Sequence, residues 1–202
     1  GTQYLPALGC ADAGRRLNPD SDEVTLTSSG DGATSEGEFW ESLNIACLEK
    51  LPLVYLIQDN GWAISTPVEK QTAGGSIGKA VANFPGFKVI ECDGTDFCRS
   101  YDAMSAAVEY ARVHRAPIMV HATCTRPYSH SLSDDEKLYK TPAEREAEAR
   151  RDPIARFSQF LRENGLASED ELAVIAAEDL DQLVMDDLDE LLLGRETLQN
   201  LL

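Results

Sequence analysis

The sequence of 202 residues lacks a long apolar run and a charged leader. No stretch of it approaches the roughly 20 apolar residues that a membrane-spanning helix needs. The chain also does not open with basic residues followed by an apolar segment, as a secretory signal does. These absences predict a cytoplasmic protein with no membrane partner.

Paired cysteines are lacking as well. The chain holds five cysteines without a CxxC spacing, and most of them lie inside apolar stretches: Cys10, Cys47, Cys92, Cys98 and Cys124. We therefore expect reduced thiols packed in the core of a cytosolic protein. Cys124 follows a predicted strand and has no indicated histidine partner, so a packed thiol is expected there rather than a nucleophile.

Basic residues are scarce, with 18 against 35 acidic residues and a formal net charge of −17. The imbalance is largest in residues 168–202, which contain eleven acidic residues and a single basic one, Arg195. Such a tail is not expected to bind nucleic acid, which requires the opposite charge. It is expected to be a solvated acidic helix, with an interface for a basic partner as the alternative.

Strand-like and helix-like segments alternate along the chain. The periodicity of apolar residues predicts strands at 23–28, 53–57, 89–90 and 118–120, and helices at 3–17, 36–50 and 97–115, with a short helix before the third strand. The run at 53–57 is continuously apolar, as in strands that are buried on both faces. This alternation predicts an α/β fold with a parallel sheet flanked by helices. The third long helix is expected to bury Tyr101, Met104, Val108 and Ala111.

The predicted α/β domain covers residues 1–165, and residues 166–202 form a helical extension or linker. Within the domain, residues 124–140 are polar and read as a long loop, a type that is usually functional or disordered. Helices are expected at 142–151, 153–164 and 169–192. The last of these contains several leucines among its acidic residues.

The triplet Gly30-Asp31-Gly32 lies between a predicted strand and a predicted helix. Glycines at this place let the backbone approach a ligand, and a helix start offers unpaired N–H groups. The aspartate adds a hard oxygen ligand, so the triplet suits a phosphate bridged by Mg²⁺. On its own, the triplet is more typical of an ordinary turn.

Asn60 follows the next strand, 29 positions after Asp31. A right-handed strand–helix–strand crossover places the carboxyl ends of both strands at one edge of the sheet. Open α/β sheets bind their ligands at that edge. We therefore expect Asp31 and Asn60 to converge on a Mg²⁺ ion that diphosphate oxygens also bind.

The segment from Gly30 to Gly37, taken with Gln58 to Ser65, resembles the thiamine diphosphate motif, which opens with Gly-Asp-Gly and closes with an asparagine. More narrowly, the chain resembles the alpha-type part of the decarboxylating component of 2-oxo acid dehydrogenase complexes. Three further stretches carry this resemblance, which covers about residues 1–165: Gly1-Thr2-Gln3 with the helix after it, the Asp93-Gly94-Thr95-Asp96 turn, and Tyr128 to Asp135, which resembles the active-site loop.

The resemblance implies thiamine diphosphate and Mg²⁺ as cofactors. It assigns the metal to Asp31, Asn60 and the backbone carbonyl of Trp62. The residues that it places against the cofactor are Gly30, Gly32 and Ala33, through their backbone at the diphosphate, and Ile64 near the thiazolium or pyrimidine. It further implies that His130 contacts the diphosphate and assists the reaction of the acyl group, and that Ser131 matches a serine that is phosphorylated in animal mitochondrial relatives. The other two histidines, His114 and His121, are expected to be structural.

The implied reaction is oxidative decarboxylation of a 2-oxo acid with transfer of the acyl group to a lipoyl arm. A beta-type part, fused or separate, would supply the glutamate that activates the cofactor, and a lipoyl-bearing acyltransferase would be the other partner. This chain alone is therefore expected to be inactive. The Ser35-Glu36-Gly37 signature favours a branched-chain (2-oxoisovalerate-type) substrate. A pyruvate, acetoin or transketolase-like enzyme is the alternative, as is an assembly module that keeps the fold without catalysis.

Overall fold

The computed structural model describes residues 1–177 and divides into two compact units. The unit Gly1–Arg156 contains the sheet, and a second unit begins at Phe157. The domain limit expected at 165 stays a prediction. The acidic leucine-rich tail, including the end of the helix expected at 192, lies outside the described residues apart from its start.

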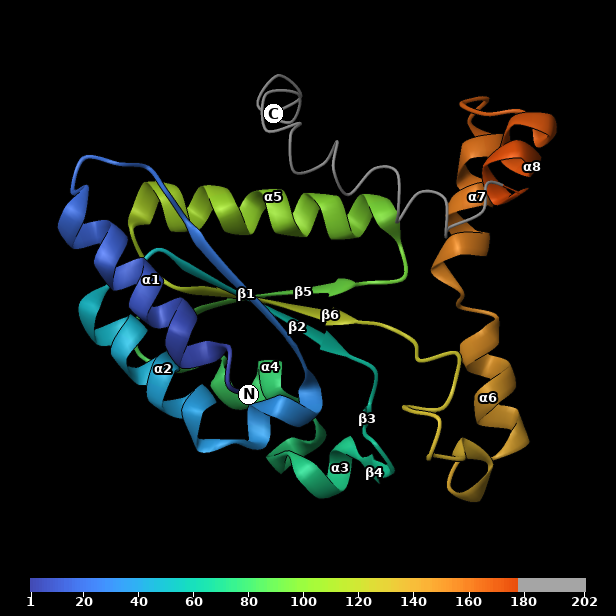
Figure 1. Ribbon diagram of the computed structural model, residues 1–202, viewed down its shortest axis with the longest axis horizontal. Coiled ribbons are helices and arrows are strands. Elements are labelled where there is room, and N and C mark those ends of the chain that lie inside the picture. Colours follow the sequence, from blue (N-terminus) through green and yellow to red (C-terminus); the bar gives the residue numbers. More distant parts are fainter. Residues whose placement is uncertain (178–202) are drawn as a thin grey trace. The chain divides into compact units, whose positions relative to one another are not determined.

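Four parallel strands form the main sheet of the first unit. Along the chain they are β1 (Thr25–Gly30), β2 (Leu53–Asp59), β5 (Lys88–Asp93) and β6 (Ile118–Thr123), and they lie in the order β1-β2-β6-β5. Every neighbouring pair is parallel. Their carboxyl ends therefore share one edge of the sheet, where β3, β4 and α3 also lie (Figure 1). The predicted parallel α/β fold is confirmed, although the first strand starts at Thr25 and reaches Gly30, two residues later than expected.

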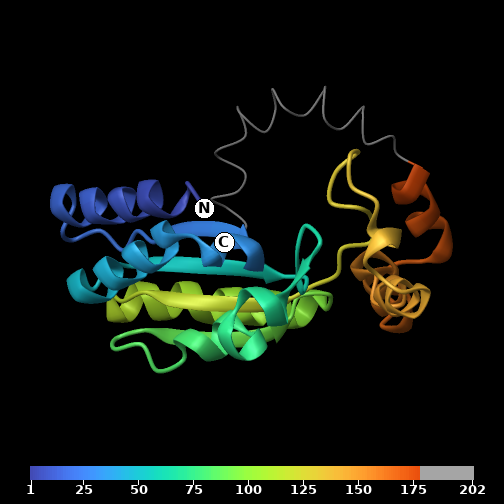
Figure 2. The same cartoon turned by 90° about the horizontal axis from the view of Figure 1, so that it is seen from below.

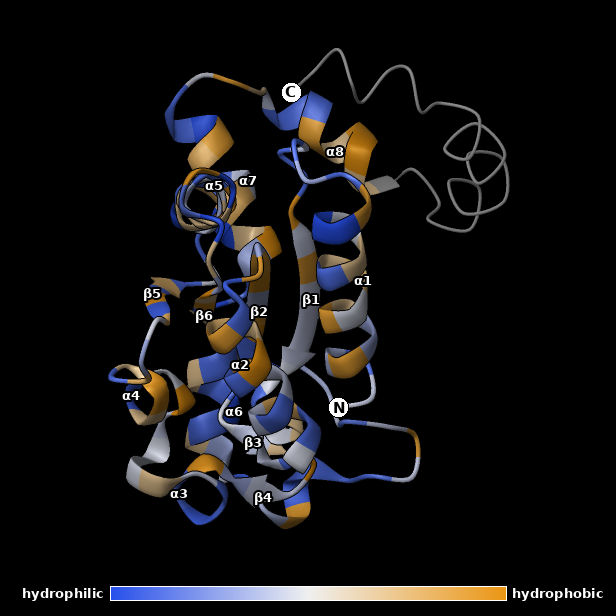
Figure 3. Ribbon diagram, turned by 90° about the vertical axis from the view of Figure 1, so that its left-hand side faces the viewer, coloured by the Kyte–Doolittle hydropathy of each residue, from blue (hydrophilic) through white to orange (hydrophobic). Residues whose placement is uncertain are grey.

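Helices cover both faces of this sheet (Figure 1). On one face lie α1 (Tyr4–Leu17), α2 (Gly37–Glu49) and the short α4 (Ile77–Val81), and on the other lies α5 (Phe97–His114). Successive side chains of β2 point to opposite faces of the sheet, so both faces are apolar and need a cover. Leu53, Tyr55 and Ile57 join the core under α1, α2 and α4, and Val54 joins the core under α5. Figure 3 shows hydrophilic and hydrophobic residues interspersed along the whole of α1, as expected for a helix that buries one face.

The buried face of α5 contains three of the four predicted residues, Met104, Val108 and Ala111, but not Tyr101. The helix buries Ala103, Ala107 and Ala111, with Met104 and Val108 partly buried beside them. Tyr101 is exposed and stacks on Phe97, with 6.4 Å between the ring centroids. The reason is the row of alanines at i, i+4 and i+8, whose small side chains let the helix lie close to the sheet, whereas a tyrosine there would hold it away.

A small hairpin that the sequence does not announce follows β2. Its strands β3 (Trp62–Ala63) and β4 (Thr66–Pro67) lead into α3 (Val68–Gln71) and the short turn η2 (Ala73–Gly75). Figure 2 shows this segment beyond the ends of the sheet strands. The hairpin therefore borders the edge at which open α/β sheets bind ligands.

The remaining described elements are short helical segments. They are η1 (Asp31–Ser35), η3 (Glu136–Leu138), α6 (Pro142–Ala149), α7 (Pro153–Glu163) and α8 (Glu169–Ala177). A capping box between Thr141 and Glu144 starts α6, as its sequence of a threonine, a proline and a glutamate favours. Across residues 1–177, no helix is long and apolar enough to cross a membrane.

The cysteines are all free, but the expectation that they pack in the core is wrong for Cys10 and Cys98, which are exposed. Both sit on helices, where an apolar neighbourhood in the sequence does not fix which side faces the sheet. Cys47, Cys92 and Cys124 are half-buried. Burial raises the pKa of the Cys124 thiol to about 11, which keeps it protonated at neutral pH and fits the expected packed thiol.

Candidate active site

Asp31 is the buried acid of the site. In the sheet Gly30 pairs with Gln58, so Asp31 leaves β1 just where β2 approaches its own end. The residue is only 1% exposed, and within residues 1–177 neither oxygen of its carboxylate has a hydrogen-bond partner. Its backbone is firmly held, because its carbonyl oxygen accepts hydrogen bonds from Thr34 Oγ1 (2.6 Å) and Gln71 Nε2 (2.8 Å).

The surroundings of Asp31 disfavour its charge. Burial raises the pKa of the Asp31 carboxyl, and the neighbouring Asp59 carboxylate raises it further. A buried carboxylate without partners costs free energy unless a cation or a donor completes it. A bound cation would offset the cost of burying this carboxylate.

Asn60 belongs to a tight turn next to Asp31. Its amide oxygen accepts a hydrogen bond from the Trp62 N–H (3.1 Å), and Gly61 takes the left-handed conformation with φ 79°. The backbone N–H of Asn60 lies near enough to lower the pKa of the Asp31 carboxyl against the larger effect of burial, although it makes no hydrogen bond to either carboxylate oxygen. The structure thus brings Asp31 and Asn60 together at the edge of the sheet where they were expected.

The donor set at this edge suits a hard cation. No group of three or more His, Cys, Asp or Glu side chains within residues 1–177 could hold a metal ion. A metal at this edge would therefore depend on mixed oxygen donors, and the predicted ones are the Asp31 carboxylate, the Asn60 amide oxygen, the Trp62 carbonyl and oxygens from a bound ligand. Mg²⁺ is commonly bound in this way, by one or two carboxylates together with ligand phosphates.

Gly32 allows the segment η1 to lie against the β3–β4 hairpin. A Cβ atom added there would lie 2.9 Å from the Cβ of Ala63 and 3.3 Å from its Cα. Ala33, the next residue, is partly buried against the main core. The glycine is therefore required by close approach of two backbones.

We expect Gly32→Ala to lower the free energy of unfolding by about 1–3 kcal/mol, because the added methyl group must push η1 away from Ala63. The matched control is Gly37→Ala, since an added Cβ at Gly37 meets no atom within 4 Å. Urea unfolding of both variants measures the difference. Equal stability of the two variants would show that the contact with Ala63 is not tight.

Ile64 lies at the tip of the hairpin in a strained conformation. Its φ of 56° is in the left-handed region, and its side chain is 52% exposed. For a β-branched residue that conformation costs about 1–3 kcal/mol and persists only where neighbours enforce it. Arg126 does so here, because its Nη1 donates to the Ile64 carbonyl oxygen (2.8 Å). The exposed isoleucine therefore points from a fixed backbone.

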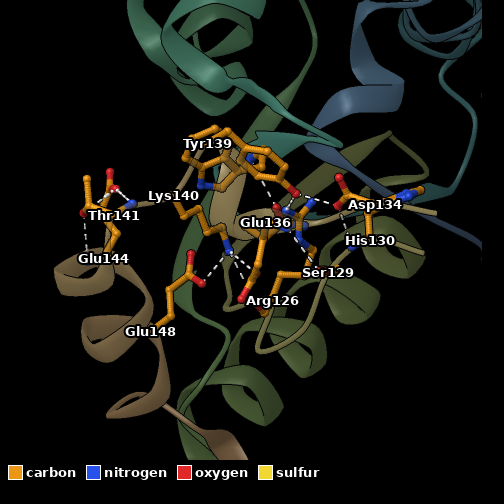
Figure 4. Close-up of polar contacts among 12 residues, drawn as sticks. Arg126, Ser129, His130, Asp134, Glu136, Tyr139, Lys140, Thr141, Glu144 and Glu148 are labelled. Atoms are coloured by element: carbon orange, nitrogen blue, oxygen red, sulfur yellow. Dashed lines mark hydrogen bonds and ion pairs between the residues drawn. The ribbon is translucent and has the colours of Figure 1, made fainter. Parts of the chain in front are cut away.

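Arg126 also organises the loop of residues 124–140 (Figure 4). Its Nη2 donates to the Tyr139 hydroxyl (2.6 Å), and that hydroxyl donates to Asp134 Oδ2 (2.6 Å). The same oxygen of Asp134 accepts from the backbone N–H of His130 (2.9 Å). This chain of hydrogen bonds connects the hairpin of Ile64 with the backbone that carries His130.

The side chains of His130 and Ser131, the two residues that the resemblance singles out in this loop, lie at its exposed part. His130 is exposed, and within the described part of the chain its ring has no hydrogen bond or ion pair. The Ser131 hydroxyl shares a hydrogen bond with that of Ser133 (3.2 Å). The structure therefore positions the backbone of the loop but does not bring either side chain into contact with Asp31 or Asn60.

Lys140 anchors the carboxyl end of the loop. Although 3% exposed, it is fully paired, since its ammonium group donates to Glu148 Oε2 (2.5 Å) and Glu136 Oε2 (3.3 Å). It also lies over the ring of Trp62, 5.9 Å from its centroid. The loop is thereby fixed both to α6 and to the turn that ends at Trp62.

We expect Lys140→Met to reduce the free energy of unfolding by about 3–5 kcal/mol, because it leaves two poorly solvated carboxylates facing each other without their cation. Lys137→Met is the matched control, since Lys137 is exposed in the same loop. Urea unfolding and the rate of proteolytic cleavage within residues 124–140 measure the effect. A stable Lys140→Met variant with a protease-resistant loop would contradict the assigned anchoring role.

Several residues that support the site escape sequence reasoning. Gln71, Arg126, Lys140 and the buried pair Asp59–His121 act on partners far away in the chain or in unforeseen elements. The available signal was weak: an aspartate directly before Asn60, and a histidine inside an otherwise apolar strand. Only the register of the strands shows that these two lie on one face.

The chain matches known proteins over most of its length. Residues 1–191 match the family model described as "Dehydrogenase E1 component". The 3-methyl-2-oxobutanoate dehydrogenase subunit alpha of Mycobacterium tuberculosis is 42% identical over 84% of this chain and 45% of its own length. The pyruvate dehydrogenase E1 component subunit alpha of Acholeplasma laidlawii is 38% identical over 85% of this chain and 49% of its own length. The corresponding Staphylococcus aureus protein is 36% identical over 84% of this chain and 45% of its own length. The chain therefore spans less than half the length of these relatives, and it belongs to the dehydrogenase E1 component family.

Proposed function

We propose that this chain forms the metal- and diphosphate-binding half of the active site of a thiamine diphosphate-dependent 2-oxo acid dehydrogenase. The observation that supports the proposal most is the buried Asp31 carboxylate, which has no hydrogen-bond partner among the described residues and lies beside the Asn60 turn. A Mg²⁺ ion bridging to the diphosphate would supply the missing positive charge. Membership of the dehydrogenase E1 component family supports the same cofactor.

In this proposal the residues of this chain bind the metal and the diphosphate and orient the cofactor. Asp31, Asn60 and the Trp62 carbonyl hold the metal, while Gly30, Gly32 and Ala33 present backbone to the diphosphate. The strained Ile64 offers an apolar side chain at the other end of the cofactor. The bound cofactor would supply the electron sink for decarboxylation. His130, carried by the loop that Arg126 and Asp134 brace, moves a proton at the reacting acyl group.

The reaction needs partners that this chain does not provide. We propose that a beta-type part supplies the glutamate that activates the cofactor and that a lipoyl-bearing acyltransferase receives the acyl group. The subunit alpha names of two relatives support a multi-chain enzyme of this kind. The chain alone is then inactive, and decarboxylation of any 2-oxo acid by the isolated chain would overturn this part of the proposal. The free cysteines of the described region fit a reducing, cytoplasmic location.

We propose a branched-chain 2-oxo acid as the substrate, because of the Ser35-Glu36-Gly37 signature. The relatives carry both substrate names, 3-methyl-2-oxobutanoate and pyruvate, so their identity does not decide the question. For the full-length assembly we expect kcat/KM to be at least about tenfold higher for 3-methyl-2-oxobutanoate than for pyruvate, as additional buried methyl groups allow. A preference for pyruvate of that size would assign the enzyme to the other class.

A non-catalytic assembly module remains the second candidate, because the acidic tail could bind a partner without any catalysis. The two are separated by thiamine diphosphate titration of the full-length assembly with and without Mg²⁺. Metal-dependent binding supports the enzyme, whereas no binding with the beta-type part present supports the assembly module.

A further inference from the structure

A row of three polar side chains crosses the sheet next to the turn between Asn60 and Trp62. Asp59 ends β2, His121 lies in β6, and Glu91 lies in β5. His121 pairs in register with Glu91 on one side and with Ile57 on the other, two residues before Asp59. Because side chains alternate along strands, all three point to the face that α1, α2 and α4 cover.

His121 is tightly held within this row. Its Nε2–H donates to Asp59 Oδ2 (2.7 Å), and its Nδ1 lies 3.6 Å from Glu91 Oε1. Both His121 and Asp59 are buried, at 6% and 8% exposure. The hydrogen bond with Asp59 raises the pKa of His121 above its usual value, against the effect of burial. The pair is therefore completed, unlike the nearby Asp31 carboxylate.

Asp59 connects His121 to the turn that carries the proposed metal ligands. Its other carboxylate oxygen, Oδ1, accepts a hydrogen bond from the Gly61 N–H (2.8 Å). Its backbone carbonyl accepts from the Cys124 N–H (2.7 Å), at the start of the active-site loop. One side chain thus joins β6 to the turn between Asn60 and Trp62.

The helix α4 leaves a slot for the ring. A Cβ atom added to Gly78 would lie 2.7 Å from His121 Nδ1 and 3.1 Å from Glu91 Oε1. The imidazole is therefore fixed by Asp59, Glu91 and the backbone of Gly78. This position keeps the Nε2–H of His121 directed at Asp59 Oδ2.

We propose that His121 is a positioning residue for the metal site, which holds Asp59 and through it the turn that presents Asn60 and the Trp62 carbonyl. This inference rests on the proposed function and extends it beyond the family's ligands. Without the His121 N–H, Asp59 Oδ2 would be a buried carboxylate oxygen lacking its donor, close to the like-charged Asp31. The carboxylate would move toward solvent or another donor and release the Gly61 N–H.

The test compares two replacements of His121 in the full-length protein assembled with its beta-type part. His121→Phe keeps a ring but removes the donor, whereas His121→Gln can place an amide N–H near the former Nε2. Calorimetric titration with Mg²⁺ at saturating thiamine diphosphate gives the metal affinity. We expect His121→Phe to lose about 10–100-fold in Mg²⁺ affinity, as changes of supporting residues do, and His121→Gln to stay near wild type. His114→Gln, in an exposed histidine of α5, is the matched control.

Amide hydrogen exchange of the cofactor-free protein gives a readout that does not depend on the metal. The Gly61 and Trp62 amides should exchange faster in His121→Phe and at the wild-type rate in His121→Gln and His114→Gln. If His121→Phe does not fold, Gly78→Ala replaces it, because the added methyl group displaces the ring while leaving Asp59 intact.

The outcomes separate the two proposals. A wild-type assembly without Mg²⁺-dependent binding overturns the proposed function, and the exchange rates then decide the role of His121 alone. Unchanged Mg²⁺ affinity in a folded His121→Phe or Gly78→Ala variant, with a binding wild type, overturns the inference. Unchanged exchange at Gly61 and Trp62 overturns it too.

Discussion

Replacing Asp31 with alanine should abolish Mg²⁺-dependent binding of thiamine diphosphate and at the same time stabilise the cofactor-free protein. Asp31 is the only charged protein ligand in the proposed set, so we expect an affinity loss beyond the roughly 100-fold limit typical of changes in supporting residues. The gain in stability follows from removing a 1% exposed carboxylate whose oxygens have no hydrogen-bond partner. That gain should be about 1–3 kcal/mol.

This opposition of stability and binding distinguishes a functional acid from a structural one. Titration of the full-length assembly measures binding, and urea unfolding without cofactor measures stability. Asp31→Asn preserves the shape and should lie between wild type and Asp31→Ala in affinity, and Asp22→Ala, at an exposed acid, serves as the control. Retained binding together with a destabilised cofactor-free protein would make Asp31 a structural residue.

Replacing His130 with glutamine should reduce turnover by about 10²–10⁴-fold, the usual contribution of a positioned acid–base group. The loss of cofactor affinity should be smaller, because the metal ligands stay intact. The fold should not suffer, since the ring of His130 is exposed and the loop is held through its backbone N–H to Asp134. A turnover effect without a stability effect follows.

Release of carbon dioxide and transfer of the acyl group to a lipoyl domain, measured on the full-length assembly, test this expectation. His114→Gln controls for loss of an exposed histidine elsewhere. Turnover of His130→Gln within the range of that control would remove His130 from the reaction and leave its loop with a structural role only.

The convergence of Asp31 and Asn60 could be predicted because it depends on general properties of the backbone. A continuous apolar strand, a helix of suitable length and a right-handed crossover place two strand ends at one edge, whatever the side chains are. The observed register, with Gly30 opposite Gln58, follows from the same rules. The predicted long helices and strands were correct for this reason. The first strand was predicted to start two residues too early, because its pairing with β2 begins only at Thr25.

The supporting residues could not be predicted, because each depends on contacts between separate elements, most of them far apart in the chain. Arg126 contacts Ile64 across a hairpin of two-residue strands, which is too short to carry a periodic signal. Likewise, His121 and Lys140 are buried charged or polar residues whose partners lie on other elements. On α5 only Tyr101 was wrongly assigned to the buried face, because packing against the sheet favours small alanines over the larger side chains that a hydropathy pattern weights most.

The central claim for this protein is that Asp31 and Asn60 bind the metal. The most direct measurement is a crystal structure of the full-length assembly with thiamine diphosphate and Mn²⁺ in place of Mg²⁺, in which anomalous scattering locates the ion. We predict one peak at about 2.1 Å from oxygens of Asp31, Asn60 and the Trp62 carbonyl and bridging to the diphosphate. A bound cofactor whose metal lies away from Asp31 and Asn60 would contradict the account.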